Sequence, residues 1–263
     1  MTYKFLSVRR DGGVEYLTLN RPDVRNAFNA QMIAELADWA SAASVSARRH
    51  DVRAIVLAGA GPVFCAGGDA KWLSSTIGYT EAENLRDARA MADMFVALDT
   101  LPAPLICRVQ GAAIGGGAGL AAVSDIVVAE EGAMFGFPEV KLGIVPAIIC
   151  PFVLAKIGQA AVRELFLTGA RFPASRAKDI GLVHAVVPPH ELDAKVGEYL
   201  REILTNAPGA VAAAKALIHD VRDHPAADAV AAGTSVIAKL RVAPEGQEGL
   251  KAFLEKRKPS WNS

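Results

Sequence analysis

The chain has 263 residues, 52% of them hydrophobic, which is enough for one large α/β domain or for a core with a helical appendage. Lys and Arg number 28, as do Asp and Glu, and the balanced charge argues against the basic stripe of a nucleic-acid-binding protein. The three cysteines are odd in number and far apart, which argues against a disulfide framework or a zinc site and indicates a reducing compartment.

The sequence carries no pattern typical of export or membrane insertion. Residues 1–11 have no apolar segment of signal-peptide length and no Arg-rich amphipathic pattern. The longest apolar runs, such as 112–123, are too short and too rich in glycine to span a bilayer. We therefore expect a soluble, cytoplasmic protein, and the mean hydropathy of +0.25 indicates apolar patches that self-association would cover.

Strands and helices are predicted to alternate through the first half of the chain. Residues 14–19 alternate in hydrophobicity and predict a strand. Apolar residues recur at helical spacing from Met32 to Ala43, behind Asn29 as a plausible N-cap. Further buried strands are predicted at 52–58, 105–109 and 125–129, and further helices at 80–101 and from about 117 to 123. This alternation implies crossover connections and a mainly parallel sheet.

The end of the chain is predicted to be almost entirely helical. After a last strand at 183–187, the predicted helices cover 190–206, 208–220, 225–241 and 246–256. Ala-rich helices of this kind usually form a packing surface for another subunit or for the main domain. We therefore predict an α/β core over residues 1–188 and a C-terminal helical region over residues 189–263.

Three segments are candidates for chemistry, at residues 64–69, 111–120 and 135–143. The first two are rich in glycine and directly follow predicted buried strands. Glycine lets a ligand oxygen approach the main chain closely, and the first N–H groups of a helix have no internal acceptor. Two such N–H groups converging from separate segments would form an oxyanion hole, with each donor contributing about 3–4 kcal/mol. Tight strand–helix packing is the alternative explanation for each glycine cluster taken alone.

Other chemistries lack their sequence patterns. Neither glycine cluster contains the G-x-G-x-x-G of dinucleotide-binding folds or the Lys-Ser/Thr pair of a phosphate-binding loop. No G-x-S-x-G elbow and no H-E-x-x-H helix occurs. The five histidines show no metal-ligand spacing and are interpreted as surface or capping residues. A nicotinamide-dependent dehydrogenase is therefore the least favoured enzyme class, and no metal site is expected.

In order and spacing, the three segments resemble the enoyl-CoA hydratase/isomerase (crotonase) family. Three further sets of residues match the family. They are 20–22 together with 26–27, then 167–169 together with Ala177 and 181–183, and finally 253–257. The resemblance extends over essentially the whole chain and implies an α/β fold with a crotonase-like ββα-repeat spiral core, a mainly parallel sheet and a C-terminal helical region. It also implies homotrimers or hexamers built as dimers of trimers. The implied substrate is an acyl-CoA thioester, with no separate cofactor, since coenzyme A is part of the substrate.

Residue by residue, the resemblance assigns the oxyanion donors to the backbone N–H groups of Gly68 and Gly116. Lys256 matches a basic residue that in relatives reaches the nucleotide phosphates bound by a neighbouring subunit; a solvated helix face is the alternative. The residues that match positions along the coenzyme A path are Arg25, Ala27, Ala66, Asp69 and Ala70. Bulky apolar residues that could line the acyl pocket, or equally belong to the core, are Trp72, Leu73, Ile77, Ile114, Phe137, Val145 and Phe152.

Glu139 matches one of two catalytic carboxylates of the family. It lies between Pro138 and an apolar, β-branched stretch, where partial burial would raise the pKa of its carboxyl toward acid–base values; the alternative is a surface Glu that starts a turn. The second carboxylate of two-Glu hydratases would stand at position 119, which is Gly119, and residues 112–123 contain no acid. Hydration usually divides its proton transfers between two carboxylates, whereas moving a double bond from the 3,4 to the 2,3 position needs only one base.

The residues 143–152 and 167–172 also resemble a bacterial subgroup described as hydratases of branched unsaturated acyl groups, which tends to have Gly at the 119 position. We therefore predict hydration of a 2-enoyl-CoA, possibly branched, to a 3-hydroxyacyl-CoA, with Glu139 and an ordered water moving the protons. The alternatives are a Δ3-Δ2 enoyl-CoA isomerase that uses the same single Glu, and a family member that binds acyl-CoA with little turnover.

Overall fold

The computed structural model describes residues 2–222 and 224–262 of the chain. Its centre is a six-stranded sheet in the order β1-β2-β3-β4-β6-β9, in which only β1 and β2 pair antiparallel. These strands are β1 (Leu6–Asp11), β2 (Val14–Leu19), β3 (Ala54–Gly59), β4 (Leu105–Val109), β6 (Ile126–Glu130) and β9 (Ala185–Val187). A smaller sheet pairs β5 (Ala112–Ile114) with β7 (Met134–Gly136) and β7 with β8 (Arg171–Pro173). The predicted α/β fold with a mainly parallel sheet is confirmed.

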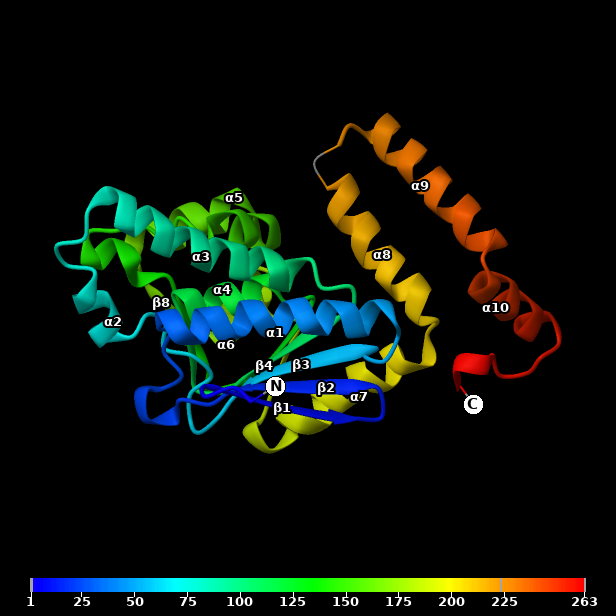
Figure 1. The fold of residues 1–263 in the computed structure, drawn as a ribbon, viewed down its shortest axis with the longest axis horizontal. Coiled ribbons are helices and arrows are strands. Elements are labelled where there is room, and N and C mark those ends of the chain that lie inside the picture. Colours follow the sequence, from blue (N-terminus) through cyan, green and yellow to red (C-terminus); the bar gives the residue numbers. More distant parts are fainter. Residues whose placement is uncertain (1, 223, 263) are drawn as a thin grey trace.

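Helices cover both faces of the main sheet (Figure 1). The helices above the sheet in that view are α1 (Ala30–Arg48), α3 (Glu81–Asp99), α4 (Gly116–Val123) and α5 (Cys150–Thr168), while α7 (Leu192–Thr205) lies below it. The shorter helices are α2 (Ala70–Ser75) and α6 (Ala174–Asp179). Three further helices, α8 (Pro208–Val221), α9 (Ala226–Val242) and α10 (Pro244–Leu254), follow α7 and together are called the arm.

Side chains of β3 point alternately to the two faces of the sheet, so this strand contributes to the hydrophobic core on both faces. Ile55 and Leu57 belong to the large cluster beneath α1, α3, α4 and α5, whereas Val56 belongs to a smaller cluster on the opposite face. Leu192 and Val196 of α7 close that smaller cluster. Because a strand places successive side chains on opposite faces, an uninterrupted apolar strand is buried on both sides.

Local signals in the sequence account for several helix boundaries. The Asn29 side chain accepts a hydrogen bond from the Met32 N–H at 2.9 Å, which confirms Asn29 as the N-cap of α1. Thr80 and Glu83 form a capping box at the start of α3. The strands predicted at 14–19 and 105–109 have the observed bounds.

Other elements were not predicted. The strand β1 forms a hairpin with β2, and β5, β7 and β8 have only three residues each, which is too short for a periodic pattern. The helix α5 contains Gly158 with a φ of 74°, where the chain kinks, and this interruption breaks the helical pattern into two short pieces.

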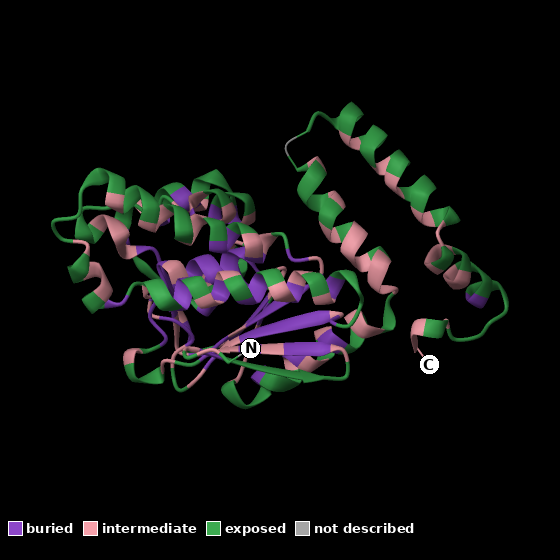
Figure 2. Cartoon of the chain, in the orientation of Figure 1, coloured by how far each residue is buried: buried purple, intermediate pink, exposed green. Residues whose placement is uncertain are grey.

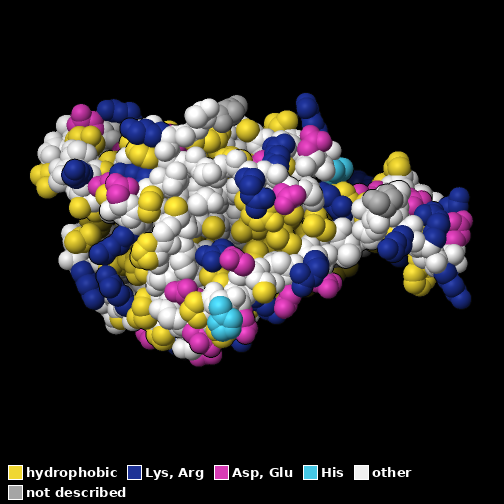
Figure 3. All heavy atoms as spheres, turned by 90° about the horizontal axis from the view of Figure 1, so that it is seen from below, with side chains coloured by type: hydrophobic (Ala, Val, Ile, Leu, Met, Phe, Trp, Pro, Cys, Tyr) yellow, Lys and Arg dark blue, Asp and Glu magenta, His cyan; other side chains and the backbone are white. Residues whose placement is uncertain are grey.

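The arm projects away from the body of the molecule (Figure 1) and is mostly exposed (Figure 2). Among the described residues, α8 and α9 bury no side chain and α10 buries Ala252. Its first helix, α8, is tied to the body by Lys215, whose ammonium group donates to the Asp125 carboxylate at 2.6 Å. Hydrophobic side chains gather beside the narrow part of the molecule that leads to the projecting end (Figure 3). The predicted region 189–263 therefore comprises α7, which packs on the sheet, and three helices that project from it. No helix in the described ranges is both long and apolar enough to cross a membrane.

Candidate active site

The two glycine-rich segments lie side by side. The Cys65 N–H donates to the Ala112 carbonyl, and the Ile114 N–H donates to the Cys65 carbonyl, both at 3.0 Å. Gly67 has a φ of 91°, and a Cβ at this position would lie 2.8 Å from the Ile114 carbonyl oxygen. Gly115 has a φ of 54°, a backbone conformation that favours glycine. Glycine at position 67 therefore permits the two segments to touch, and glycine at position 115 permits the positive φ that precedes α4.

The backbone N–H groups of Gly68 and Gly116 lie at this junction. One adjacent N–H group of each is used: Asp69 donates to the Phe28 carbonyl and Gly115 to the Gly136 carbonyl, each at 2.8 Å. Within the described part of the chain, neither Gly68 nor Gly116 has a hydrogen-bond acceptor for its N–H. Gly116 is also the first residue of α4, so its N–H lies at the positive end of that helix dipole.

Glu139 lies against the same junction. It follows β7 in a short 3-10 helix (Pro138–Leu142), with Pro138 at its first position and Gly143 in the left-handed region at its end. The Glu139 Oε1 atom lies 2.9 Å from where a Cβ of Gly115 would be, and its Oε2 atom is buried without a partner among the described residues. Burial raises the pKa of the Glu139 carboxyl above its ordinary value. A carboxylate with a raised pKa is a better proton acceptor than an ordinary Glu, which suits it to acid–base chemistry.

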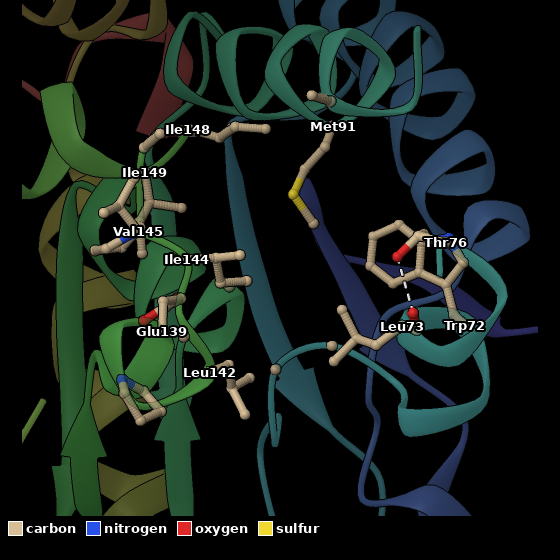
Figure 4. Close-up of a pocket in the computed structure, with 18 of the residues that line it drawn as sticks. Trp72, Leu73, Thr76, Met91, Glu139, Leu142, Ile144, Val145, Ile148 and Ile149 are labelled. Carbon is tan, nitrogen blue, oxygen red and sulfur yellow. Dashed lines mark hydrogen bonds between the residues drawn. The ribbon is translucent and has the colours of Figure 1, made fainter. Parts of the chain in front are cut away.

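The donors and the carboxyl share one cavity of about 420 Å³. In Figure 4, Glu139 and Leu142 lie on one side of this cavity, Trp72 and Leu73 on the other, and Met91 descends from α3. The remaining described lining residues are Ala66, Gly67, Gly68, Thr76, Asn84, Asp87, Ala88, Ile114, Gly115, Gly116, Pro138 and 144–149. The wall is mostly apolar, with two carboxyl groups, and therefore fits an acyl chain with one reactive polar end.

A family model described as enoyl-CoA hydratase/isomerase matches residues 9–263. The chain belongs to the enoyl-CoA hydratase/isomerase family. Solved structures of similar sequence agree with this assignment. An enoyl-CoA hydratase from Shewanella pealeana is 37% identical, with a TM-score of 0.93 and coverage of 98% of this chain and 96% of that one.

Two further solved structures are similar over nearly their whole length. Pseudomonas aeruginosa AtuE is 37% identical, with a TM-score of 0.94 and coverage of 99% of this chain and 100% of that one. An enoyl-CoA hydratase/isomerase from Marinobacter aquaeolei is also 37% identical, with a TM-score of 0.92 and the same coverage. The family resemblance stated from the sequence is confirmed.

For an enoyl-CoA hydratase/isomerase, the surroundings of Gly119 are informative. A Cβ at this position would lie 2.4 Å from the Ile149 Cγ2 atom and 3.0 Å from the Phe95 ring. Ile149 and Phe95 are both buried. The position where two-Glu relatives are expected to carry a second carboxylate is therefore closed by apolar packing as well as lacking an acid.

The residues predicted along the coenzyme A path occupy different environments. Ala66 lines the cavity, and its N–H donates to the carbonyl of the exposed Arg25 at 3.0 Å. The Asp69 carboxylate is engaged within the protein, since it accepts from Arg21 at 2.8 Å and caps α2 through the Lys71 N–H. Ala27 is buried and Ala70 is exposed at the start of α2.

Lys256 is exposed just after α10, on the arm, and the arm and α2 lie at opposite ends of the molecule (Figure 1). Within one chain it is therefore remote from the cavity.

Three of the residues that were named as acyl-pocket lining or core lie outside the cavity wall. Ile77 is 82% exposed, Phe137 is fully buried against Phe166 and Phe172, and Phe152 packs on Phe95. Trp72, Leu73, Ile114 and Val145 do line the cavity. The cavity residues of α3 were missed from the sequence, although their spacing places Asn84, Asp87, Ala88 and Met91 on one face of the helix.

Proposed function

We propose that this protein hydrates a 2-enoyl-CoA thioester to a 3-hydroxyacyl-CoA. One cavity holds the half-buried Glu139 carboxyl and the N–H groups of Gly68 and Gly116, which have no acceptor among the described residues, and this juxtaposition supports the activity. A thioester carbonyl that accepts from both N–H groups would have its C2=C3 bond polarised toward attack at C3. The two donors would strengthen their hydrogen bonds as the oxygen gains charge, which stabilises the enolate more than the substrate.

In this mechanism a single carboxyl moves the proton. Ionised Glu139 takes a proton from a water as the water oxygen bonds to C3, and the electrons of the C2=C3 bond pass to the thioester oxygen. The enolate then collapses and C2 receives the proton held by Glu139, so that one water is added and the carboxylate is regenerated. Burial of Glu139 favours this role, because a raised pKa stabilises the protonated intermediate state of the carboxyl.

One observation favours a second activity. Because Ile149 and Phe95 fill the space beside Gly119, the oxyanion donors face one neighbouring carboxyl at Glu139. A single base suffices for isomerisation of a 3-enoyl thioester, in which Glu139 would remove a proton from C2 and return it to C4. The same donors would hold the dienolate of this reaction as they would hold the enolate of hydration.

Product analysis separates these activities. The protein is mixed with matched 2-enoyl and 3-enoyl thioesters, and double-bond absorbance and product mass are followed. Gain of one water from the 2-enoyl substrate supports hydration, whereas a shifted double bond without a change of mass supports isomerisation. Binding of both thioesters with neither reaction points to an acyl-CoA-binding protein and contradicts the proposed hydratase.

The assignment of Glu139 is tested by E139Q, which keeps the shape of the side chain and removes its base. We expect kcat to fall by a factor of about 10² to 10⁴ while the thioester still binds. E131Q is the matched control, because Glu131 lies on an exposed turn before β7 and should leave kcat unchanged. Equal turnover by E139Q and the wild type would contradict the assignment.

We further propose that the arm mediates assembly into a trimer or hexamer and that Lys256 contacts the coenzyme A phosphates bound by a neighbouring copy. The large exposed apolar side chains on α8 and α9, among them Ile218 and Val230, support a covered arm. Light scattering measures the assembly, and K256Q should weaken thioester binding only in the assembled protein. A monomer with full thioester affinity would contradict both statements.

A further inference from the structure

One carboxyl in the cavity has no role in the proposed hydration. Asp87 lies on α3, one helical turn from Met91, and both residues line the cavity. The other polar residue of this face is occupied, since the Asn84 amide donates to the Tyr79 and Thr80 carbonyls at 3.3 and 3.2 Å. Among the described residues, Asp87 makes no hydrogen bond or ion pair.

The surroundings of Asp87 supply no positive charge. The residues one turn away on α3 are Glu83 and Met91, so the helix offers no cation at ion-pair spacing. The described residues of the cavity wall include no Lys, Arg or His, and the other carboxyl in the wall is Glu139. Burial raises the pKa of the Asp87 carboxyl, as expected for an acid without a partner in an apolar wall.

We propose that Asp87 is a specificity-determining residue that selects acyl chains by the polarity of the portion facing α3. It favours a chain with a hydrogen-bond donor, such as a hydroxyl group, and disfavours a chain that ends in a carboxylate. This inference rests on the proposed function, in which the acyl chain of the thioester occupies the cavity.

Three physical effects give this order of preference. An alkyl chain laid over Asp87 removes water from the carboxyl and offers no hydrogen bond in return. A hydroxyl group in the same place replaces the lost water. A carboxylate brings a like charge into an apolar wall that holds two acidic groups and no cation, so repulsion adds to the cost of desolvation.

The test compares the dissociation constants of three saturated CoA thioesters of equal chain length, ending in methyl, hydroxyl or carboxylate. Saturated chains report binding independently of turnover. For the wild type we expect the carboxylate to bind at least about tenfold more weakly than the hydroxyl. D87N should recover most of this loss, and D87L should tighten methyl binding and weaken hydroxyl binding, each by about fivefold. D93N is the control, because Asp93 is exposed on the same helix in a pair with Arg89.

The outcomes are distinguishable from those of the proposed function. Equal affinity for the carboxylate and hydroxyl chains in the wild type overturns the role of Asp87, as do unchanged ratios in folded D87N and D87L. If the thioesters bind with the expected ratios but 2-enoyl substrates gain no water, the hydratase fails and the role of Asp87 stands. If no thioester binds, both proposals are overturned.

Discussion

A methyl group added at position 119 should destabilise the protein, although the same change usually stabilises a helix. Gly119 lies inside α4 with helical backbone angles, so replacement by Ala should gain about 0.5–1 kcal/mol from helix propensity alone. Against this gain, the new Cβ would stand 2.4 Å from Ile149 Cγ2 and 3.0 Å from the ring of Phe95, both well inside van der Waals contact. Overpacking of this kind costs about 1–3 kcal/mol, so after the helical gain the free energy of unfolding of G119A should fall by roughly 1 kcal/mol, and by about 2.5 kcal/mol at most.

Urea denaturation of the wild type and four variants measures this effect. G197A is the matched control, because Gly197 lies inside α7 and its Cβ would meet only the tip of Arg201 at 3.5 Å; it should be as stable as the wild type or more so. I149A removes the atom in closest contact, and the double variant should be at least about 1 kcal/mol more stable than the sum of the single changes predicts. A G119A protein with wild-type or higher stability refutes the closed packing at this position.

Three further predictions concern the carboxylates. Because Glu139 must be ionised to accept a proton and its pKa is raised, kcat/KM should increase with pH through a value above the ordinary range of Glu; a pH-independent profile over the acidic range contradicts this. Because the pKa of Glu139 is raised by folding, its ionisation lowers the stability of the folded protein at pH 7. The urea concentration at the unfolding midpoint should therefore be higher for E139Q than for the wild type at pH 7. This difference should vanish below about pH 4, where the carboxyl is protonated both folded and unfolded, and a constant difference would count against it. D69A leaves Arg21 buried without its partner and should cost about 3–5 kcal/mol in urea denaturation, whereas D93A, which breaks an exposed pair, should cost less than about 1 kcal/mol; equal losses would refute the structural role of Asp69.

The elements that were predicted correctly are those whose pattern is long enough to repeat. The helix from Ala30 and the strand from Val14 follow from spacing and capping residues alone. The strands of the small sheet have three residues each, and their hydrogen-bond partners lie far away in the sequence, so only the folded chain defines them. The kink at Gly158 likewise hides α5 from a search for a continuous helical stripe.

The site divides in the same way. Gly68, Gly116 and Glu139 could be named because the family resemblance assigns donor and acid roles to particular residue types at fixed places along the chain. Apolar bulk carries no such information, since a cavity wall and a closed core use the same side chains. The sequence therefore left Phe137 open between pocket and core, and the structure places it in the core; Asp87, which lines the cavity, was overlooked.

The contact between the two glycine-rich segments has a consequence for how catalytic power would be maintained. The N–H groups of Gly68 and Gly116 are oriented by hydrogen bonds of the protein interior, such as those that join Cys65 to β5, before any ligand enters. Little reorganisation is then needed when negative charge develops on a bound oxygen. Distant core substitutions that slightly displace these two segments should consequently lower kcat before they measurably lower the melting temperature. Turnover would then report small changes in core packing more sensitively than thermal stability does.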